Sequence, residues 1–126
     1  MDKGELGQWI RRVAATLRRH GYDAVVVAPA DATMPPGAAI TFSHHGVVVR
    51  DHAAWPDGVG CCLHDARNNQ IKPVLLLVCQ DEFVGGAGNV ARRAVTGNVP
   101  PIAVWVLSTA DATLDMGDGR IIHVGD

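Results

Sequence analysis

The chain is short of several informative residue types, and each shortage excludes a class of protein. Its three cysteines are too few, and odd in number, for the disulfide framework of a small secreted domain. Charged residues make up 19% of the chain and the net charge is -2, which argues against a surface built throughout to bind nucleic acid. No apolar run approaches the roughly 18 residues that a membrane-spanning helix needs. We therefore expect a cytoplasmic protein with reduced thiols and no membrane partner.

Apolar residues are plentiful, at 48% of the chain, and the first of them follow a helical pattern. Between residues 6 and 17 they recur at i, i+3, i+4 and i+7, which is the spacing of one helix face. Asp2 with Glu5 three residues later matches a capping box. Gly21 stands where a helix needs a left-handed residue at its end. These signals predict an amphipathic helix from about residue 3 to residue 20.

The rest of the chain contains mostly strand signals. Continuous apolar runs predict buried strands over residues 22–28, 71–79 and 100–108. Residues 38–51 predict a hairpin, and residues 59–65 predict an extended segment that pairs with 71–79. A Gly-rich entry and a helix are expected over 85–97, and Asp118-Gly119 predicts a terminal hairpin.

This order of elements predicts one domain over residues 1–126. It reads helix, strand, β hairpins, strand, helix, strand and terminal hairpin. The fold class is α/β, with α+β as the alternative, and two helices pack on a mixed β-sheet. The predicted core consists of apolar residues from the first helix and the buried strands: Trp9, Ile10, Val13, Leu17, Val25, Val26, Val27, Leu75, Leu76, Leu77, Val104 and Val106.

One set of polar residues has the types that phosphodiester chemistry uses. Asp57 follows a proline, and Gln70-x-Lys72 comes later in the chain, directly before an apolar run. A helix ending in LRRHGYDAVVV, followed by a β-meander, a helix and a strand, resembles the α-β-β-β-α-β core of restriction-endonuclease-like domains, particularly those of the Mrr type. The resemblance covers most of residues 5–107.

The resemblance implies a metal-dependent nuclease site. Asp57 would bind Mg²⁺ or Mn²⁺, and Gln70 would replace the second acid. Lys72 would hold the attacking water, and Glu5 would be the acid of the first helix. Hard cations take carboxylate oxygens, and a cation stabilises the charge that develops on phosphate.

The order of residues around Lys72 departs from this family. There the apolar run precedes the acid-x-Lys motif, whereas here it follows Lys72, with Pro73 in between. We therefore expect a restriction-endonuclease-like domain with a degraded active site that binds nucleic acid or a protein partner. An active metal-dependent nuclease is one alternative, and a metal cofactor is expected only in that case.

A basic stripe is predicted on the first helix. Arg11 with Arg18, and Arg12 with Arg19, each repeat at seven residues, so they line its polar side. Such a stripe suits nucleic-acid phosphates or an acidic protein surface, although a solvated helix face also explains it. The positive mean hydropathy of +0.11 leaves room for a homodimer.

A second resemblance favours a protein-interaction role. Residues 88–100, GNVARRAVTGNVP, are similar to the tail of the small subunits of diol dehydratase reactivating factors. Those subunits are non-enzymatic and chaperone-like. The similarity implies a non-catalytic, chaperone-like subunit as a further alternative.

Three weaker patterns complete the candidates. Gly86-x-Gly88-x-x-Ala91 has the form of a dinucleotide-binding motif, but a loop before a helix explains it equally. Cys61 and His64 could form a nucleophilic pair, without a recognisable activating context. Zinc-ligand residue types gather without a zinc spacing: His44, His45, Asp51, His52, Cys61, Cys62, His64 and Asp65.

Overall fold

The computed structural model describes residues 2–27, 37–80 and 84–125. These residues form three α-helices and one mixed sheet whose seven strands lie in chain order, which confirms the predicted α/β domain. The helices are α1 (Lys3–Arg19), α2 (Trp55–Asn69) and α3 (Val84–Val95), and a 3₁₀ turn, η1 (His52–Ala54), precedes α2. The strands are β1 (Val25–Val26), β2 (Ile40–Phe42), β3 (His45–Asp51), β4 (Lys72–Cys79), β5 (Ala103–Ser108), β6 (Thr113–Asp115) and β7 (Ile121–His123).

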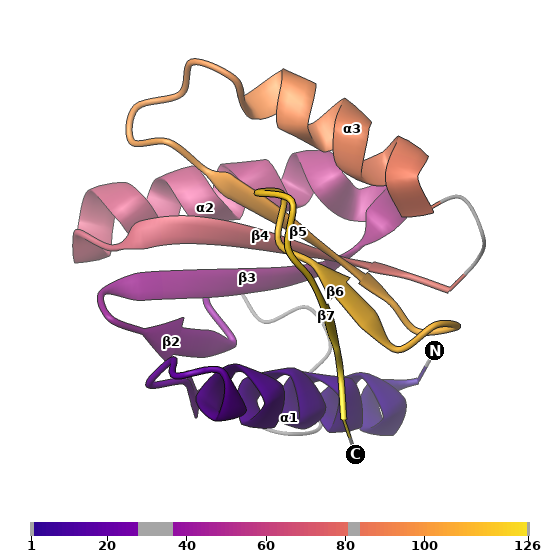
Figure 1. Ribbon diagram of the computed structural model, residues 1–126. Coiled ribbons are helices and arrows are strands. Elements are labelled where there is room, and N and C mark those ends of the chain that lie inside the picture. The colour runs from indigo at the N-terminus through magenta and orange to yellow at the C-terminus, as the bar shows by residue number, and fades with distance from the viewer. Residues whose placement is uncertain (1, 28–36, 81–83, 126) are drawn as a thin grey trace.

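Parallel strands form the centre of the sheet, and antiparallel strands form both ends. Strands β3, β4 and β5 are parallel, and α2 and α3 are the crossovers between them. The two crossover helices cover one face of the sheet, and α1 lies on the other face (Figure 1). None of the helices in the described ranges is long and apolar enough to cross a membrane.

Side chains alternate between the two faces, as they must in a strand. Val47 and Val49 of β3 pack in the cluster on the α1 side, whereas Val48 packs in the cluster under α2 and α3. The same alternation divides Leu75 and Leu76 of β4. The central strands are therefore buried on both faces, as their continuous apolar runs predict.

Local signals at the two ends of α1 are confirmed. The Asp2 side chain accepts a hydrogen bond from the Glu5 backbone N–H at 2.8 Å, which caps the start of the helix. Gly21 has φ +91°, a left-handed conformation that glycine adopts without strain. The helix buries Ile10, Val13 and Leu17 against the sheet.

Both predicted hairpins form, with turns that differ in length. Strands β2 and β3 are antiparallel and join through Ser43 and His44, which have φ values of 42° and 64°. Strands β6 and β7 pair Asp115 with Ile121, so the terminal turn is longer than the Asp-Gly dipeptide alone.

The predicted strand over residues 59–65 is wrong, because this segment belongs to α2. The buried residues of α2 are Gly58, Cys62, Asp65 and Ala66, which follow the helical spacing i, i+4, i+7 and i+8. A Cβ at residue 58 would lie 2.5 Å from a Leu75 methyl carbon, so glycine allows the helix to pack closely on β4. The sheet therefore carries three helices and not two.

Helix α3 begins earlier than predicted. It starts at residue 84 and ends at Val95, so Gly86 and Gly88 lie inside the helix and not in a loop before it. A Cβ at residue 88 would lie 2.7 Å from a Val106 methyl carbon. Gly88 therefore serves close packing of α3 on β5.

Two of the predicted core residues are exposed, and two others, Trp9 and Val26, are only partly buried. Val25 and Val27 are each 52% exposed, and the strand predicted over 22–28 is reduced to the two residues of β1. Val26 packs against the α1-side core, so its neighbours point to the opposite face. Pro29, the expected end of this strand, lies outside the described residues.

Candidate functional site

The structure does not bring the predicted nuclease residues together. Asp57 lies in the first turn of α2, and Gln70 is its C-terminal cap. At 1.5 Å per residue these two positions are roughly 20 Å apart along the helix. Lys72 begins β4, two residues after Gln70. The carboxylate and the ammonium group therefore do not share a cleft.

Asp57 instead forms an ion pair with a buried arginine. The Arg50 side chain is 2% exposed, and its Nε donates to Asp57 Oδ2 at 2.8 Å. Other guanidinium nitrogens of Arg50 donate to the Val49 carbonyl at 2.8 Å and contact Cys61 Sγ at 3.1 Å. A buried cation needs such partners. The Asp57 carboxylate therefore has a structural explanation that requires no metal.

Arg50 is a residue that the sequence patterns missed. It ends the run VVVR within a strand that is buried on both faces. A single arginine at the end of an apolar run was the available signal, because a charge in that position needs an acidic partner from a neighbouring element. The partner comes from the first turn of α2, which was not predicted as a helix.

Glu5 lies far from Asp57 in the architecture. It is exposed in the first turn of α1, on the opposite face of the sheet from α2 (Figure 1). The four predicted catalytic residues thus occupy the start of α1, the start of α2, and the junction between α2 and β4.

The predicted basic stripe is divided into two flanks. Arg12 Nε donates to the Gly125 carbonyl at 2.9 Å, and Arg12 Nη2 donates to the Val124 carbonyl at 3.3 Å. Arg19 Nη2 donates to Thr16 Oγ1 at 3.0 Å, and that oxygen also accepts from the Gly125 N–H at 3.2 Å. Arg12 therefore fastens the C-terminal segment to α1, and Arg19 bonds to the threonine that also holds this segment.

The other flank of α1 faces β1 and is open. Arg18 Nη1 donates to the Ala24 carbonyl at 2.8 Å, whereas Arg11 is exposed and makes no hydrogen bond or ion pair within the described ranges. A groove of about 450 Å³ lies here. We call it the α1–β1 groove, and its lining residues are Arg11, Arg18, Asp23, Ala24, Val25 and Val26.

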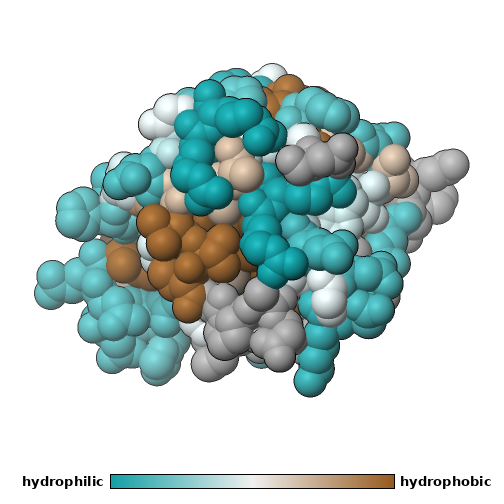
Figure 2. All heavy atoms as spheres, turned by 90° about the horizontal axis from the view of Figure 1, so that it is seen from below, coloured by the Kyte–Doolittle hydropathy of each residue, from teal (hydrophilic) through white to brown (hydrophobic). Residues whose placement is uncertain are grey.

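The surface on the α1 side has a hydrophobic area. Figure 2 shows this area with hydrophilic residues along part of its border. Val25 and Val26 of β1 line the α1–β1 groove together with two arginines of α1. The α1–β1 groove therefore joins positive charge to apolar surface.

Among the residues that the structure describes, the backbone N–H and C=O of Val26 in β1 have no partner strand. Val25 is opposite Thr41 and Val26 is opposite Ile40, and the Val27 N–H donates to the Ala39 carbonyl at 2.8 Å. Backbone groups alternate in direction along an antiparallel strand. The N–H and C=O of Val26 therefore point away from β2, toward the edge of the sheet.

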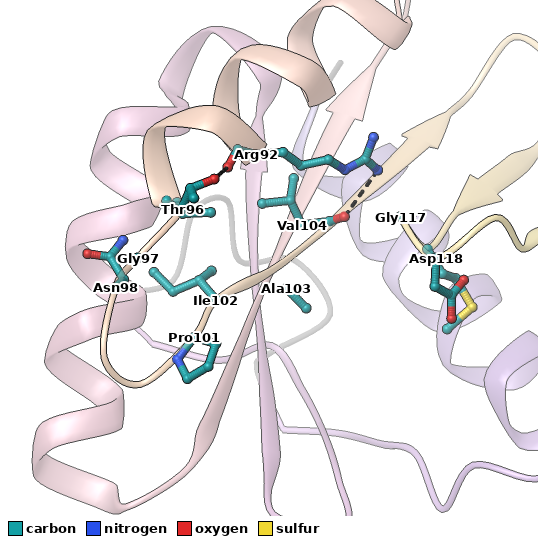
Figure 3. A pocket seen from close by; sticks show the side chains of 12 residues that line it. Arg92, Thr96, Gly97, Asn98, Pro101, Ile102, Ala103, Val104, Gly117 and Asp118 are labelled. Atoms are coloured by element: carbon teal, nitrogen blue, oxygen red, sulfur yellow. Dashed lines mark hydrogen bonds between the residues drawn. The ribbon is translucent and has the colours of Figure 1, made fainter.

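A second cavity, of about 420 Å³, lies where α3 ends. Arg92 crosses it and donates to the Val104 carbonyl at 3.2 Å (Figure 3). Arg92 Nη2 also lies 3.6 Å from Asp115 Oδ1. The Thr96 hydroxyl donates back to the Arg92 carbonyl. The arginine thus holds α3 to β5 and β6. The polar groups named here bond to one another, so they serve the fold.

The weaker patterns gain no support from the geometry. Burial raises the pKa of the Cys62 thiol to about 12, so this residue stays protonated at neutral pH. Cys61 contacts Arg50, not a histidine. No three His, Cys, Asp or Glu residues within residues 2–27, 37–80 and 84–125 are arranged to hold a metal ion.

No protein-family model, no curated protein and no solved structure matches the chain.

Proposed function

We propose that this chain is a non-catalytic binding domain with a restriction-endonuclease-like arrangement of elements. It recognises an acidic partner protein through the α1–β1 groove. The order α1-β1-β2-β3-α2-β4 supports the resemblance, because it is the helix and strand order of that core, with α2 and β4 in place of the later helix and strand on which the resemblance in sequence rests.

The contact between Asp57 and Arg50 is the observation that carries the absence of catalysis. A metal-dependent phosphodiesterase needs carboxylate oxygens free for the metal and a cation near the attacked phosphate. One carboxylate oxygen of Asp57 accepts from the buried Arg50 guanidinium at 2.8 Å, and Lys72 lies at the other end of α2. The two residues therefore do not form one catalytic site.

The composition of the groove favours a protein partner over nucleic acid. Nucleic-acid surfaces combine several cations, because each phosphate contact adds affinity. Here Arg12 and Arg19 are used within the protein, and Asp23 lies beside Arg11 and Arg18. Apolar area next to a few charges is typical of a protein-binding surface.

A cleavage assay tests the absence of catalysis. Supercoiled plasmid and single-stranded DNA are incubated with the protein and Mg²⁺ or Mn²⁺, beside Asp57→Asn and Lys72→Ala. We expect no cleavage by any of the three proteins. Cleavage by the wild-type chain that both substitutions abolish would overturn the proposal.

An affinity measurement tests the preference for a protein partner. Binding of fluorescent duplex DNA is followed by anisotropy at low and physiological salt. We expect only weak binding that disappears at physiological salt, because the two arginines that line the groove can neutralise few phosphates. Tight binding at physiological salt that Arg11→Glu abolishes would assign the groove to nucleic acid instead.

A further inference from the structure

We infer that the α1–β1 groove takes an extended acidic segment of the partner, which adds to the sheet as a strand beside Val26. This inference rests on the proposed function and names its binding mode. Addition of a strand to an exposed sheet edge is a recurring mode of peptide recognition. Main-chain hydrogen bonds then supply affinity, and alternate side chains supply specificity.

The backbone of β1 provides the docking point. The N–H and C=O of Val26 point away from β2, as the pairing of Val25 with Thr41 and of Val27 with Ala39 requires. Ala24 offers its carbonyl on the same side, but Arg18 already donates to it at 2.8 Å. An incoming strand therefore pairs at Val26, about 4.8 Å from β1.

Charge selects the side chains on one face of the incoming strand. Arg11 and Arg18 are seven residues apart on α1, which is about 10 Å along its axis. Same-face residues of an extended chain are spaced at about 7 Å and, two steps on, about 14 Å. Two acidic residues on one face of the segment can therefore reach both guanidinium groups.

Apolar contact selects the side chains on the other face. Val26 packs toward α1, and Val25 and Val27 point to the opposite side of the sheet with 52% of each exposed. An incoming strand extends that face, so its apolar residues would cover these two valines. The segment that fits thus alternates acidic and apolar residues.

Charge also disfavours a second copy of this chain as the occupant. A two-fold axis through the β1 edges would place the same patch on both sides of the interface. Arg11 and Arg18 of one copy would then approach those of the other. Like charges across an interface are unfavourable, whereas an acidic segment neutralises both arginines.

The experiment uses a fluorescent peptide of alternating Glu and Val, with a Lys and Val peptide as the control. We expect the Glu and Val peptide alone to bind in anisotropy titrations. Hydrogen exchange followed by NMR should show the Val26 amide protected on binding. Arg11→Glu should weaken binding about tenfold, the factor that 1.4 kcal/mol represents, whereas Arg93→Glu on the exposed side of α3 should leave it unchanged.

A second variant addresses the backbone without altering charge. Val26→Pro removes the N–H that points to the edge and leaves the pairing of Val25 and Val27 with β2 in place. It should weaken peptide binding while the circular dichroism spectrum of the folded protein persists. If this variant fails to fold, the Val26 amide protection in the wild-type chain decides the question alone.

Several results would overturn the inference. The first is that the Glu and Val peptide does not bind, or that both peptides bind equally. The second is that the peptide binds and leaves the Val26 amide unprotected. The third is a concentration-dependent dimer that protects this amide without peptide. Duplex DNA that protects the amide in place of peptide would also overturn it. The cleavage assay is independent of all these outcomes, so a nuclease would be recognised even if the peptide bound.

Discussion

The two flanks of α1 carry the same residue type at the same spacing and differ in what those residues do. On one flank, Arg12 and Arg19 bond to the C-terminal segment or to the threonine that holds it. On the other, Arg18 bonds to the Ala24 carbonyl, and Arg11 lines the α1–β1 groove. A regular stripe of charge in the sequence thus contains both fold-stabilising residues and residues available to a partner.

The difference arises from how the two ends of the sheet meet α1. Both ends of the sheet contact α1. One contact is made by β1, and the other by the segment after β7. One side is closed by hydrogen bonds to Gly125. The other ends at a two-residue strand, which leaves the groove open.

The largest expected effect is a difference in thiol reactivity between two adjacent residues of α2, Cys61 and Cys62. Burial raises the pKa of Cys62 from 9.0 to about 12, so its thiolate fraction should fall roughly a thousandfold. The pKa of Cys62 is higher in the folded protein than in the unfolded chain. The contribution of the neutral thiol to stability is therefore fully present below about pH 9 and is lost as the pH rises toward about 12.

Alkylation measures this difference. Iodoacetamide labelling at pH 8, followed by mass spectrometry, should modify Cys61 in the folded protein and both residues in urea. Equal labelling of the two thiols in the folded protein would show that α2 does not bury Cys62 as described.

A smaller effect separates the two flanks of α1 directly. Arg12→Ala should lower the free energy of unfolding by about 2 kcal/mol, because it removes hydrogen bonds to two carbonyls. Its guanidinium also lies 3.9 Å from the centroid of the Trp9 ring. Arg11→Ala should change the same quantity by less than about 0.5 kcal/mol. Urea denaturation provides the measurement, and equal losses for both variants would remove the distinction between the flanks.

The smallest effect tests the residue that closes one flank. Thr16 is fully buried, and its hydroxyl contacts both Arg19 and the Gly125 N–H. Thr16→Val should cost about 1 kcal/mol of unfolding free energy. Thr96→Val is the matched control, since that residue is exposed directly after the end of α3 and its hydroxyl donates to the carbonyl of Arg92. A cost that is equal at both positions would contradict the role of Thr16.

Much of the fold follows from sequence because its signals are local. Asp2 and Gly21 mark the ends of α1, and the apolar periods distinguish α1 from the buried strands. Pro73 is tolerated in β4 because β5 begins to pair only at Val74, so no hydrogen bond to β5 is lost. The ends of α1 and the apolar periods depend on neighbouring residues, whereas the tolerance of Pro73 depends on where β5 begins to pair.

The remaining features depend on tertiary contacts that a single sequence does not reveal. The segment VGCCLHD is short enough to fit a strand, and its burial as a helix depends on β4 beneath it. The exposure of Val25 follows from the shortness of β1. The pairing of Asp57 with Arg50 requires both β3 and α2 to be in place, which is why Asp57 resembled a metal ligand.

The stability of Asp57→Asn with and without Mn²⁺ tests the central claim most directly. If Asp57 stabilises the fold by neutralising Arg50, the substitution lowers the free energy of unfolding by about 1 to 2 kcal/mol. Mn²⁺ then leaves the free energy of unfolding of both proteins unchanged. If Asp57 binds a catalytic metal, Mn²⁺ stabilises the wild-type chain, the substitution abolishes that stabilisation, and the metal-free proteins unfold alike.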